Sequence, residues 1–370
     1  MLIILLLCIL GVRMAWNLYY KKNWKRDITV TLHFDTQAVY AGETAVLYEV
    51  IENRKALPVP VLEVGFHTRR ELKFKDTENT NVSDFIYKRD IFSVLGWQKI
   101  TRQIQVHCTK RGYYRIEEAD LTAHSLLYDR RYTRQLETEA GIYVYPAKAE
   151  ISDIMALCER MLGCLQCTKG LYEDPFAFRT IREYTLQDPM KTINWKASAK
   201  NGKLMVNTFD SVLTQKAMIY LDVEDSGILK YDNLIEESIS VAATLVRKLI
   251  KQGMEVGFAS NARTEQGETC CLACSNEKTQ LVKMERMLAR YRTEDGWGRF
   301  TDCFAALEED MVWIFISKNM TDELLGQIAA YIGREQMAII ICPVIKGEKP
   351  ALSKAEGRNI RIIFREVERS

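Results

Sequence analysis

Basic side chains gather around one short segment in the middle of the chain, where they have the charge to bind an anionic group. They are Arg182, Lys191, Lys196, Lys200 and Lys203. We predict a helix over 189–200, with Asp188 as its N-cap and Pro189 at its first position. Helix N-termini bind phosphate and carboxylate groups, although the carboxylate of Asp188 competes for this one. A chemical role for the segment would make the protein a hydrolase or transferase centred on 182–200.

The same segment supports a structural interpretation. Arg182, Glu183, Asp188 and Lys196 bring both signs of charge close together in the sequence. They could therefore form an ion-pair network that fastens the segment to its neighbours. Gly202 would end the predicted helix, because glycine readily adopts the left-handed conformation that follows a helix. We favour the structural role, which predicts paired charges and no open pocket.

Beyond residue 210, apolar segments of strand length alternate with segments of helix length. The predicted strands are 217–222, 254–259, 269–275, 311–316, 337–342 and 359–364, and the predicted helices are 234–252, 277–291 and 322–331. Such alternation indicates a mostly parallel sheet with helices on both faces. We therefore expect 211–370 to be a doubly wound, Rossmann-like α/β domain. Ligands of such sheets bind beyond the carboxyl ends of the strands, where the strand order reverses.

Residues 27–150 have a different pattern, in which short segments alternate apolar and polar side chains. The predicted strands are 27–34, 45–52, 59–66, 98–107 and 142–145. Short strands separated by turn residues favour an antiparallel β-sandwich. All four histidines lie in this region, scattered among the strands, and we expect them to be structural; they are His33, His67, His107 and His124.

The first twenty residues are almost wholly apolar, interrupted only by Arg13 among charged side chains. At 1.5 Å per residue a helix over 2–20 would be about 28 Å long, close to the thickness of a bilayer core. We predict a transmembrane anchor over 1–20, with Trp16, Tyr19 and Tyr20 at the membrane interface. A signal peptide or a core helix is the alternative. Four cations follow the span, which places the rest of the chain in the cytoplasm by the positive-inside rule.

Composition excludes several classes of protein. Lys and Arg number 51 against 49 Asp and Glu, a net charge of +2, so the overall charge gives no reason to expect nucleic-acid binding. Two Cys-x-x-Cys pairs occur, but Cys271 and Cys274 would point to opposite faces of a strand and could not bind one ion. Cys164 and Cys167 lie far away in sequence, so we expect no zinc site. The sequence has no phosphate loop, dinucleotide fingerprint or nucleophile elbow, so we expect neither catalysis nor a cofactor.

The segment 151–210 resembles a known family. Its pattern is similar to the signature of the proteins called domain of unknown function 58. The matching residues are Arg182, Tyr184, Asp188, Ile193, Trp195, Lys196, Ser198, Ala199, Lys200, Gly202 and Leu204. The resemblance extends to the flanks, with an apolar start, a β-rich segment and an α/β end. It implies that 211–370 is a von Willebrand factor A-type domain and that the partner is a MoxR-type AAA+ ATPase.

Domains of the von Willebrand factor A type carry a metal-ion-dependent adhesion site after their first strand. The positions that correspond here are Asp222, Glu224, Ser226 and Thr301. Hard cations such as Mg²⁺ need oxygen ligands, which these side chains could provide. Glu224 departs from the serine of the pattern, and Lys318 follows the strand where an acidic residue is expected. We therefore predict weak or no Mg²⁺ binding, with Lys318 close to Asp222 or Glu224.

These interpretations combine into one functional hypothesis. We expect a single-pass protein of the cell membrane that acts as a non-catalytic interaction or assembly protein, as an adaptor for a MoxR-type AAA+ ATPase. The alternative is the hydrolase or transferase centred on 182–200. The two differ in whether the charged side chains of that segment are paired or converge in a pocket.

Overall fold

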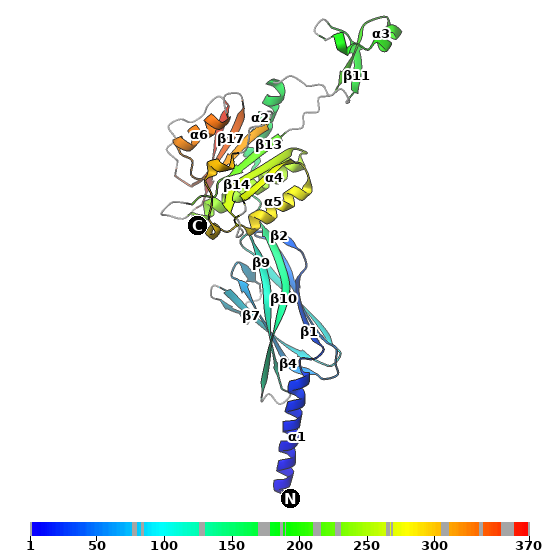
Figure 1. The fold of residues 1–370 in the computed structure, drawn as a ribbon, viewed down its shortest axis with the longest axis vertical. Coiled ribbons are helices and arrows are strands. Elements are labelled where there is room, and N and C mark those ends of the chain that lie inside the picture. The colour runs from blue at the N-terminus through cyan, green and yellow to red at the C-terminus, as the bar shows by residue number, and fades with distance from the viewer. Residues whose placement is uncertain are drawn as a thin grey trace. The chain divides into compact units, whose positions relative to one another are not determined.

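The computed structural model of the chain divides into two compact units (Figure 1). The first comprises Met1–Lys148 and Glu285–Arg292, and the second comprises Ala149–Met284 and Thr293–Ser370. The residues that the structure describes are 2–75, 80–82, 85–125, 130–168, 178–185, 188, 190–209, 216–225, 231–263, 267, 269–304, 311–332, 336–348 and 359–368.

Helix α1 (Leu2–Asn23) opens the first unit and is long and apolar enough to cross a membrane. Most of its side chains are exposed, but Asn17 and Tyr20 near its end are buried. Tyr20 and Trp24 are buried in a core cluster with residues of the following strands, and their rings lie beside Tyr132. The expectation that Tyr20 lies in an aromatic belt at the membrane interface is therefore wrong, because the sandwich covers its ring.

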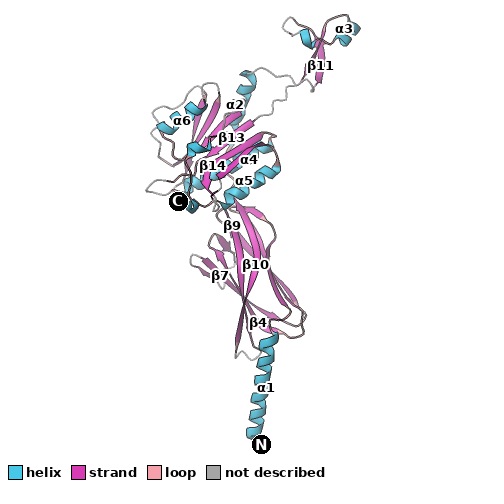
Figure 2. Ribbon diagram, viewed as in Figure 1, coloured by secondary structure: helices cyan, strands magenta, loops and turns pink. Residues whose placement is uncertain are grey.

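Two packed sheets follow α1 (Figure 2). The four-stranded sheet has the order β1 (Ile28–Phe34), β3 (Thr44–Asn53), β8 (Lys99–Cys108), β5 (Leu72–Phe74). The six-stranded sheet has the order β2 (Ala38–Tyr40), β10 (Arg131–Tyr145), β9 (Gly112–His124), β4 (Val59–Arg69), β7 (Phe85–Val94), β6 (Thr80–Val82).

Alternation of buried and exposed side chains explains the packing of these sheets. In β1 and β3 every second residue is buried, as period-two alternation on a half-buried strand requires. The buried residues of both sheets form two clusters: one includes Leu47, Val106, Phe66 and Ile142, and the other contains Tyr20 and Trp24. Neighbouring strands run antiparallel except β2 and β10, which pair in parallel over Tyr143–Tyr145. The predicted antiparallel arrangement is thus correct for all described pairs of the sandwich but that one.

The second unit begins with α2 (Ser152–Thr168) and a two-stranded antiparallel sheet of β11 (Phe178–Glu183) and β12 (Met205–Phe209). A 3-10 turn, η1 (Met190–Thr192), and helix α3 (Trp195–Asn201) lie between these strands in sequence. The N-cap of α3 is Asn194, whose side chain accepts a hydrogen bond from the Ala197 N–H, and Gly202 ends the helix with φ 66°. The prediction of an Asp188 N-cap is therefore wrong, and Pro189 lies outside the described residues.

A six-stranded sheet forms the rest of the second unit. Its order is β15 (Thr269–Ser275), β14 (Glu255–Arg263), β13 (Lys216–Leu221), β16 (Met311–Ile316), β17 (Met337–Ile345), β18 (Ile360–Val367). All neighbours pair in parallel except β14 and β15. The remaining helical elements are α4 (Asp232–Lys251), α5 (Lys278–Arg290), α6 (Asp322–Ile332) and the 3-10 turns η2 (Thr293–Asp295) and η3 (Phe300–Cys303).

Helices cover both faces of this sheet, which explains why its strands are apolar throughout. All six residues of β16 are buried. Helix α4 packs on β13, β14 and β17, whereas Leu325 and Ile328 of α6 share a core cluster with Tyr220 and Phe315. The predicted mostly parallel, doubly covered α/β sheet is present in the structure.

Candidate functional site

Asp222 lies at the point where the strand order of the α/β sheet reverses. It directly follows β13, whose neighbours on either side are β14 and β16. Its side chain is buried, with a residue exposure of 3%. Oδ1 accepts hydrogen bonds from Asn261 Nδ2 at 2.8 Å and from the Glu224 N–H at 3.0 Å, and Oδ2 accepts from Ser317 Oγ at 2.7 Å. Both carboxylate oxygens of Asp222 therefore have protein donors.

Asn261 is the member of this site that the sequence did not indicate. Its Oδ1 accepts from the Val223 N–H at 2.8 Å, while its Nδ2 donates to Asp222 and to the Gly298 carbonyl. The amide thus ties the ends of β13 and β14 together. A signal for it existed: the polar pair Ser260 and Asn261 interrupts an apolar strand at its carboxyl end.

Lys318 forms a buried ion pair with Asp225. The ammonium contacts Oδ1 of Asp225, and the two side chains are 7% and 1% exposed. Lys318 was expected near Asp222 or Glu224, and the structure places it on the next acid of the same loop instead. The segment after β16 therefore supplies a cation to the loop that follows β13.

The remaining predicted metal ligands have other surroundings. Glu224 is half-buried, and its carbonyl accepts from Asn319 Nδ2 at 2.8 Å. Thr301 lies in η3, where its carbonyl accepts from the Phe304 N–H. Ser226 lies outside the described residues. In the part of the chain that the structure describes, no group of three or more His, Cys, Asp or Glu is placed to hold a metal ion.

Arg182, a residue of β11, forms a bidentate ion pair with Asp188. Arg182 Nη1 donates to Asp188 Oδ2 at 2.7 Å, and Nη2 donates to Oδ1 at 2.6 Å. The N–H and hydroxyl of Thr185 also donate to Asp188 Oδ2, each at 2.8 Å. These hydrogen bonds, with Arg182 the largest contributor, hold the pKa of Asp188 well below its usual range. Asp188 closes a loop in this way rather than starting a helix.

The other ion pair of this segment differs from the predicted network. Glu183 pairs with Lys203, with Oε1 and Nζ 2.8 Å apart, whereas Lys196 is exposed on α3. Ser198 joins the helix to β12, since its hydroxyl donates to the Asn194 carbonyl and accepts from the Met205 N–H. Arg182 with Asp188, Glu183 with Lys203 and Ser198 thus give the segment a bonded framework.

Large apolar side chains of the same segment are exposed. They are Ile181, Met190, Trp195 and Leu204, with Met190 at 73% and Trp195 at 66%. Lys191, Lys196 and Lys200 are exposed nearby in the sequence, and Tyr184 is half-buried. Tryptophan and methionine at such exposures have a chemistry typical of binding surfaces.

Residues 180–311 match the family described as Protein of unknown function DUF58. The match covers the bonded segment, β13 and Asp222. Over 237 residues the chain is also 21% identical to the uncharacterized protein YeaD of Bacillus subtilis (strain 168). That alignment covers 64% of this chain and 56% of YeaD, so the chain spans little more than half the length of this curated relative.

Solved structures with some likeness include two small domains. One is a CARDB domain from Pyrococcus furiosus in complex with di-metal ions, with 16% identity over 30% of this chain and 92% of that one and a TM-score of 0.19. The other is a non-cellulosomal cohesin from Archaeoglobus fulgidus, with 10% identity over 35% and 97% and a TM-score of 0.22. At these scores neither bears on the function of this chain.

Proposed function

We propose that this chain is a membrane-anchored, non-catalytic interaction protein, and that the segment 178–209 docks a protein partner. The observation that carries the proposal is the exposure of Met190 and Trp195 in a segment whose nearby acids are already paired with Arg182 and Lys203. Tryptophan often dominates the binding energy of protein interfaces. An exposed aromatic side chain on a bonded framework loses little conformational entropy on binding.

The partner that we propose is an AAA+ ATPase of the MoxR type, as the family resemblance implies. Charge supports an acidic surface on that partner, since Lys191, Lys196 and Lys200 are exposed around Trp195 in the sequence. Complementary charge would speed and orient docking more than it would tighten it. Asp222 and Asp225 are buried and bonded, so among the described acids of the loop after β13 only Glu224, which is half-buried, is left to meet a partner. The α/β sheet would then be a von Willebrand factor A-type domain that supports the docking segment.

Helix α1 would hold this assembly at the membrane. Lys21 and Lys22 lie in its last turn, and Lys25 and Arg26 follow. By the positive-inside rule the units after α1 would be cytoplasmic. Anchoring raises the local concentration of whatever the soluble part binds. A reporter enzyme fused to the C-terminus tests the orientation, since activity restricted to the outer side would contradict it.

Co-purification tests the docking surface. We expect an AAA+ ATPase to be recovered with the full chain from detergent-solubilised membranes in the presence of ATP. The substitution Trp195→Ala should lower its recovery at least tenfold, a typical loss for an interface tryptophan. Trp97→Ala is the matched control, because Trp97 is 73% exposed in the first unit. Equal losses in both variants, or full recovery with Trp195→Ala, would refute docking through α3.

A hydrolase or transferase centred on 182–200 is the competing function. It would need Arg182 or Asp188 to face a substrate, and their mutual pairing supports the structural role instead. The co-purification experiment also separates the two functions. A catalytic segment would give no reason for Trp195→Ala to release a protein partner.

A further inference from the structure

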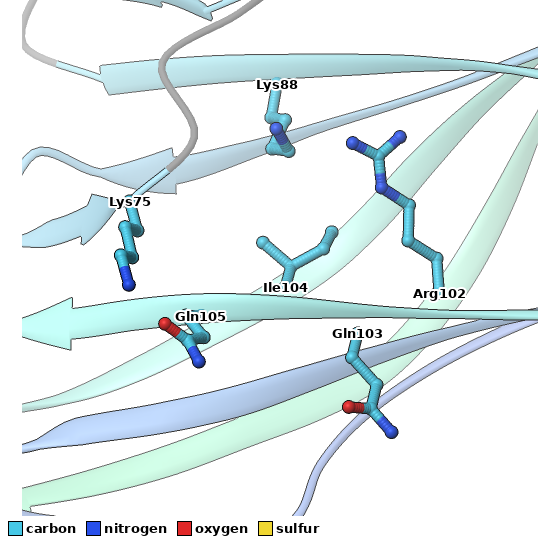
Figure 3. Close-up of a pocket in the computed structure, with 6 residues that line it drawn as sticks. All are labelled: Lys75, Lys88, Arg102, Gln103, Ile104 and Gln105. Carbon is cyan, nitrogen blue, oxygen red and sulfur yellow. The ribbon is translucent and has the colours of Figure 1, made fainter.

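A polar cavity of about 390 Å³ lies in the β-sandwich of the first unit (Figure 3). The described residues that line it are Lys75, Lys88, Arg102, Gln103, Ile104 and Gln105. Three of these six are cationic and none of them is acidic. Lys88 and Arg102 extend toward one another from β7 and β8, strands of different sheets, whereas Gln103 and Gln105 leave β8 on its other side. A cavity walled by cations favours an anionic ligand.

Lys88 is the decisive residue because its ammonium is buried without a hydrogen bond. The side chain is 0% exposed, and Nζ has no hydrogen-bond partner among the described residues. The nearest acid is Asp90, with Oδ1 3.7 Å away, and the ring of Phe74 lies 5.5 Å from Nζ. Burying an ammonium without hydrogen-bond partners costs free energy. A buried ammonium beside a cavity is therefore a candidate ligand-binding group.

Two cations of this cluster share one described acid, Asp90. Its Oδ1 lies 2.9 Å from Arg102 Nη1 and 3.7 Å from Lys88 Nζ. Glu49 stands directly opposite Arg102 in the register of β3 and β8. Burial, followed by repulsion from Asp90, raises the pKa of Glu49 to about 8, so its carboxyl group is mainly protonated at neutral pH.

The charge balance fits a dianion. Among the described residues, Lys75, Lys88 and Arg102 contribute three positive charges and Asp90 one negative charge, an excess of two positive charges. Arginine and lysine together are common ligands of phosphate groups. The volume is at the lower end of that of small-molecule sites and exceeds the need of a bare phosphate. Space therefore remains for an organic substituent beside Ile104.

We propose that this cavity binds a small phosphomonoester, with Lys88 and Arg102 holding the phosphate and Ile104 contacting the organic group. The site belongs to the sandwich alone and is independent of the docking segment. Its ligand would make the first unit responsive to a phosphorylated small molecule.

Calorimetry on the full chain in detergent tests the proposal, with glycerol 3-phosphate as the probe and inorganic phosphate, succinate and glycerol as comparisons. We expect glycerol 3-phosphate to bind at least as tightly as phosphate and tenfold or more tightly than succinate, and glycerol not to bind. Absence of heat with millimolar glycerol 3-phosphate would overturn the site. Equal affinity for succinate would overturn the assignment to phosphate.

Variants identify the ligand-binding groups. Lys88→Met keeps the length of the side chain and removes its charge, and it should weaken binding tenfold or more, as should Arg102→Gln. Lys73→Gln is the control, because Lys73 is the exposed residue of β5, next to the strand end that presents Lys75. Should Lys88→Met fail to fold, Arg102→Gln decides alone, since Arg102 is partly exposed. Unchanged affinity in a folded Lys88→Met variant would refute the proposal.

Affinity measured against pH gives a second readout. Glu49 faces Asp90, Arg102 and Lys88, so its ionisation adds a negative charge to the cluster. Binding of the phosphate dianion should therefore weaken severalfold as the pH rises from 7 to 9. Glu49→Gln should remove that dependence and keep the affinity seen at pH 7. A wild-type pH profile identical to that of Glu49→Gln would contradict the arrangement.

Discussion

Asn261 Nδ2 donates to Asp222 Oδ1 at 2.8 Å and links the ends of two adjacent parallel strands. The carboxylate of Asp222 is therefore bonded by donors of the protein itself. The carboxylate oxygens are satisfied by Asn261, Ser317 and the Glu224 N–H, so the strand ends are braced where sheets of this type usually hold a ligand. This pairing leads to the first two predictions.

Loss of the Asn261 amide should destabilise the α/β domain. Asn261→Ala removes a hydrogen bond to a buried carboxylate, which typically contributes about 1.5–3 kcal/mol. We expect a lower melting temperature by differential scanning fluorimetry. Asn276→Ala is the control, because Asn276 is an exposed asparagine that follows β15. Equal melting temperatures of the two variants would show that the hydrogen bond from Asn261 does not stabilise the domain.

Magnesium should bind weakly or not at all at Asp222. A cation would have to displace Asn261 or Ser317 from the carboxylate. The ammonium of Lys318, which follows β16, already pairs with Asp225 of the loop after β13. Calorimetry should therefore show no Mg²⁺ binding at micromolar concentration. Micromolar binding that Asp222→Ala abolishes would contradict this expectation.

Removal of Lys318 should be more damaging than removal of both members of its pair. Lys318→Met leaves Asp225 buried beside an apolar side chain, at a cost of about 3–5 kcal/mol. The double variant Lys318→Met with Asp225→Leu removes both charges and should recover most of that stability. Chemical denaturation checks the order. A double variant less stable than Lys318→Met would show that the pair has a further role.

The pair of Arg182 and Asp188 should give a pH-dependent contribution to stability. Hydrogen bonds from Arg182 and Thr185 lower the pKa of Asp188 from its ordinary value of 3.8, so the folded state favours the carboxylate. The contribution is fully present above about pH 4 and is lost as the pH falls through the folded-state pKa. Asp188→Asn should therefore melt at a lower temperature than the parent at pH 7, and the two should converge in strong acid.

Lys203→Gln supplies the control for this variant. It removes the neighbouring pair with Glu183 and should change the melting temperature less, because that pair is largely exposed to solvent. If Asp188→Asn melted like the parent at every pH and yet lost all function, the bracing role would be wrong. A direct chemical role would then be the better explanation.

Much of the architecture could be predicted because burial dictates it. The strands of the α/β sheet lie between two layers of helices and read as apolar runs, of which β16 is the plainest example. The sandwich strands β1 and β3 show their alternation in the sequence. The strand β7 escaped prediction because its inward positions Ile86, Lys88, Asp90 and Phe92 mix charged and apolar side chains. Lys88, which lines the polar cavity, thus occupies a buried position where the alternation predicts an apolar side chain.

The contacts of the candidate sites were harder to predict than the strands. Asp188 with Pro189 has the composition of a helix start, yet Asn194 supplies the same chemistry closer to α3. The choice between them depends on where the chain turns to pair β11 with β12, which is a tertiary property. Asn261 reaches Asp222 only because β14 lies beside β13 in the sheet. No local spacing could reveal that neighbour.

The burial of Tyr20 and Trp24 packs the end of α1 against the sandwich. Lys55 adds to this junction, since its ammonium donates to the carbonyls of Trp24 and Arg26. In a bilayer, a spanning helix adjusts to membrane thickness by changing its tilt. If α1 is packed rigidly on the sandwich, a change in its tilt would also tilt the sandwich strands. The orientation of the sandwich relative to the membrane would then depend on the thickness of the surrounding bilayer.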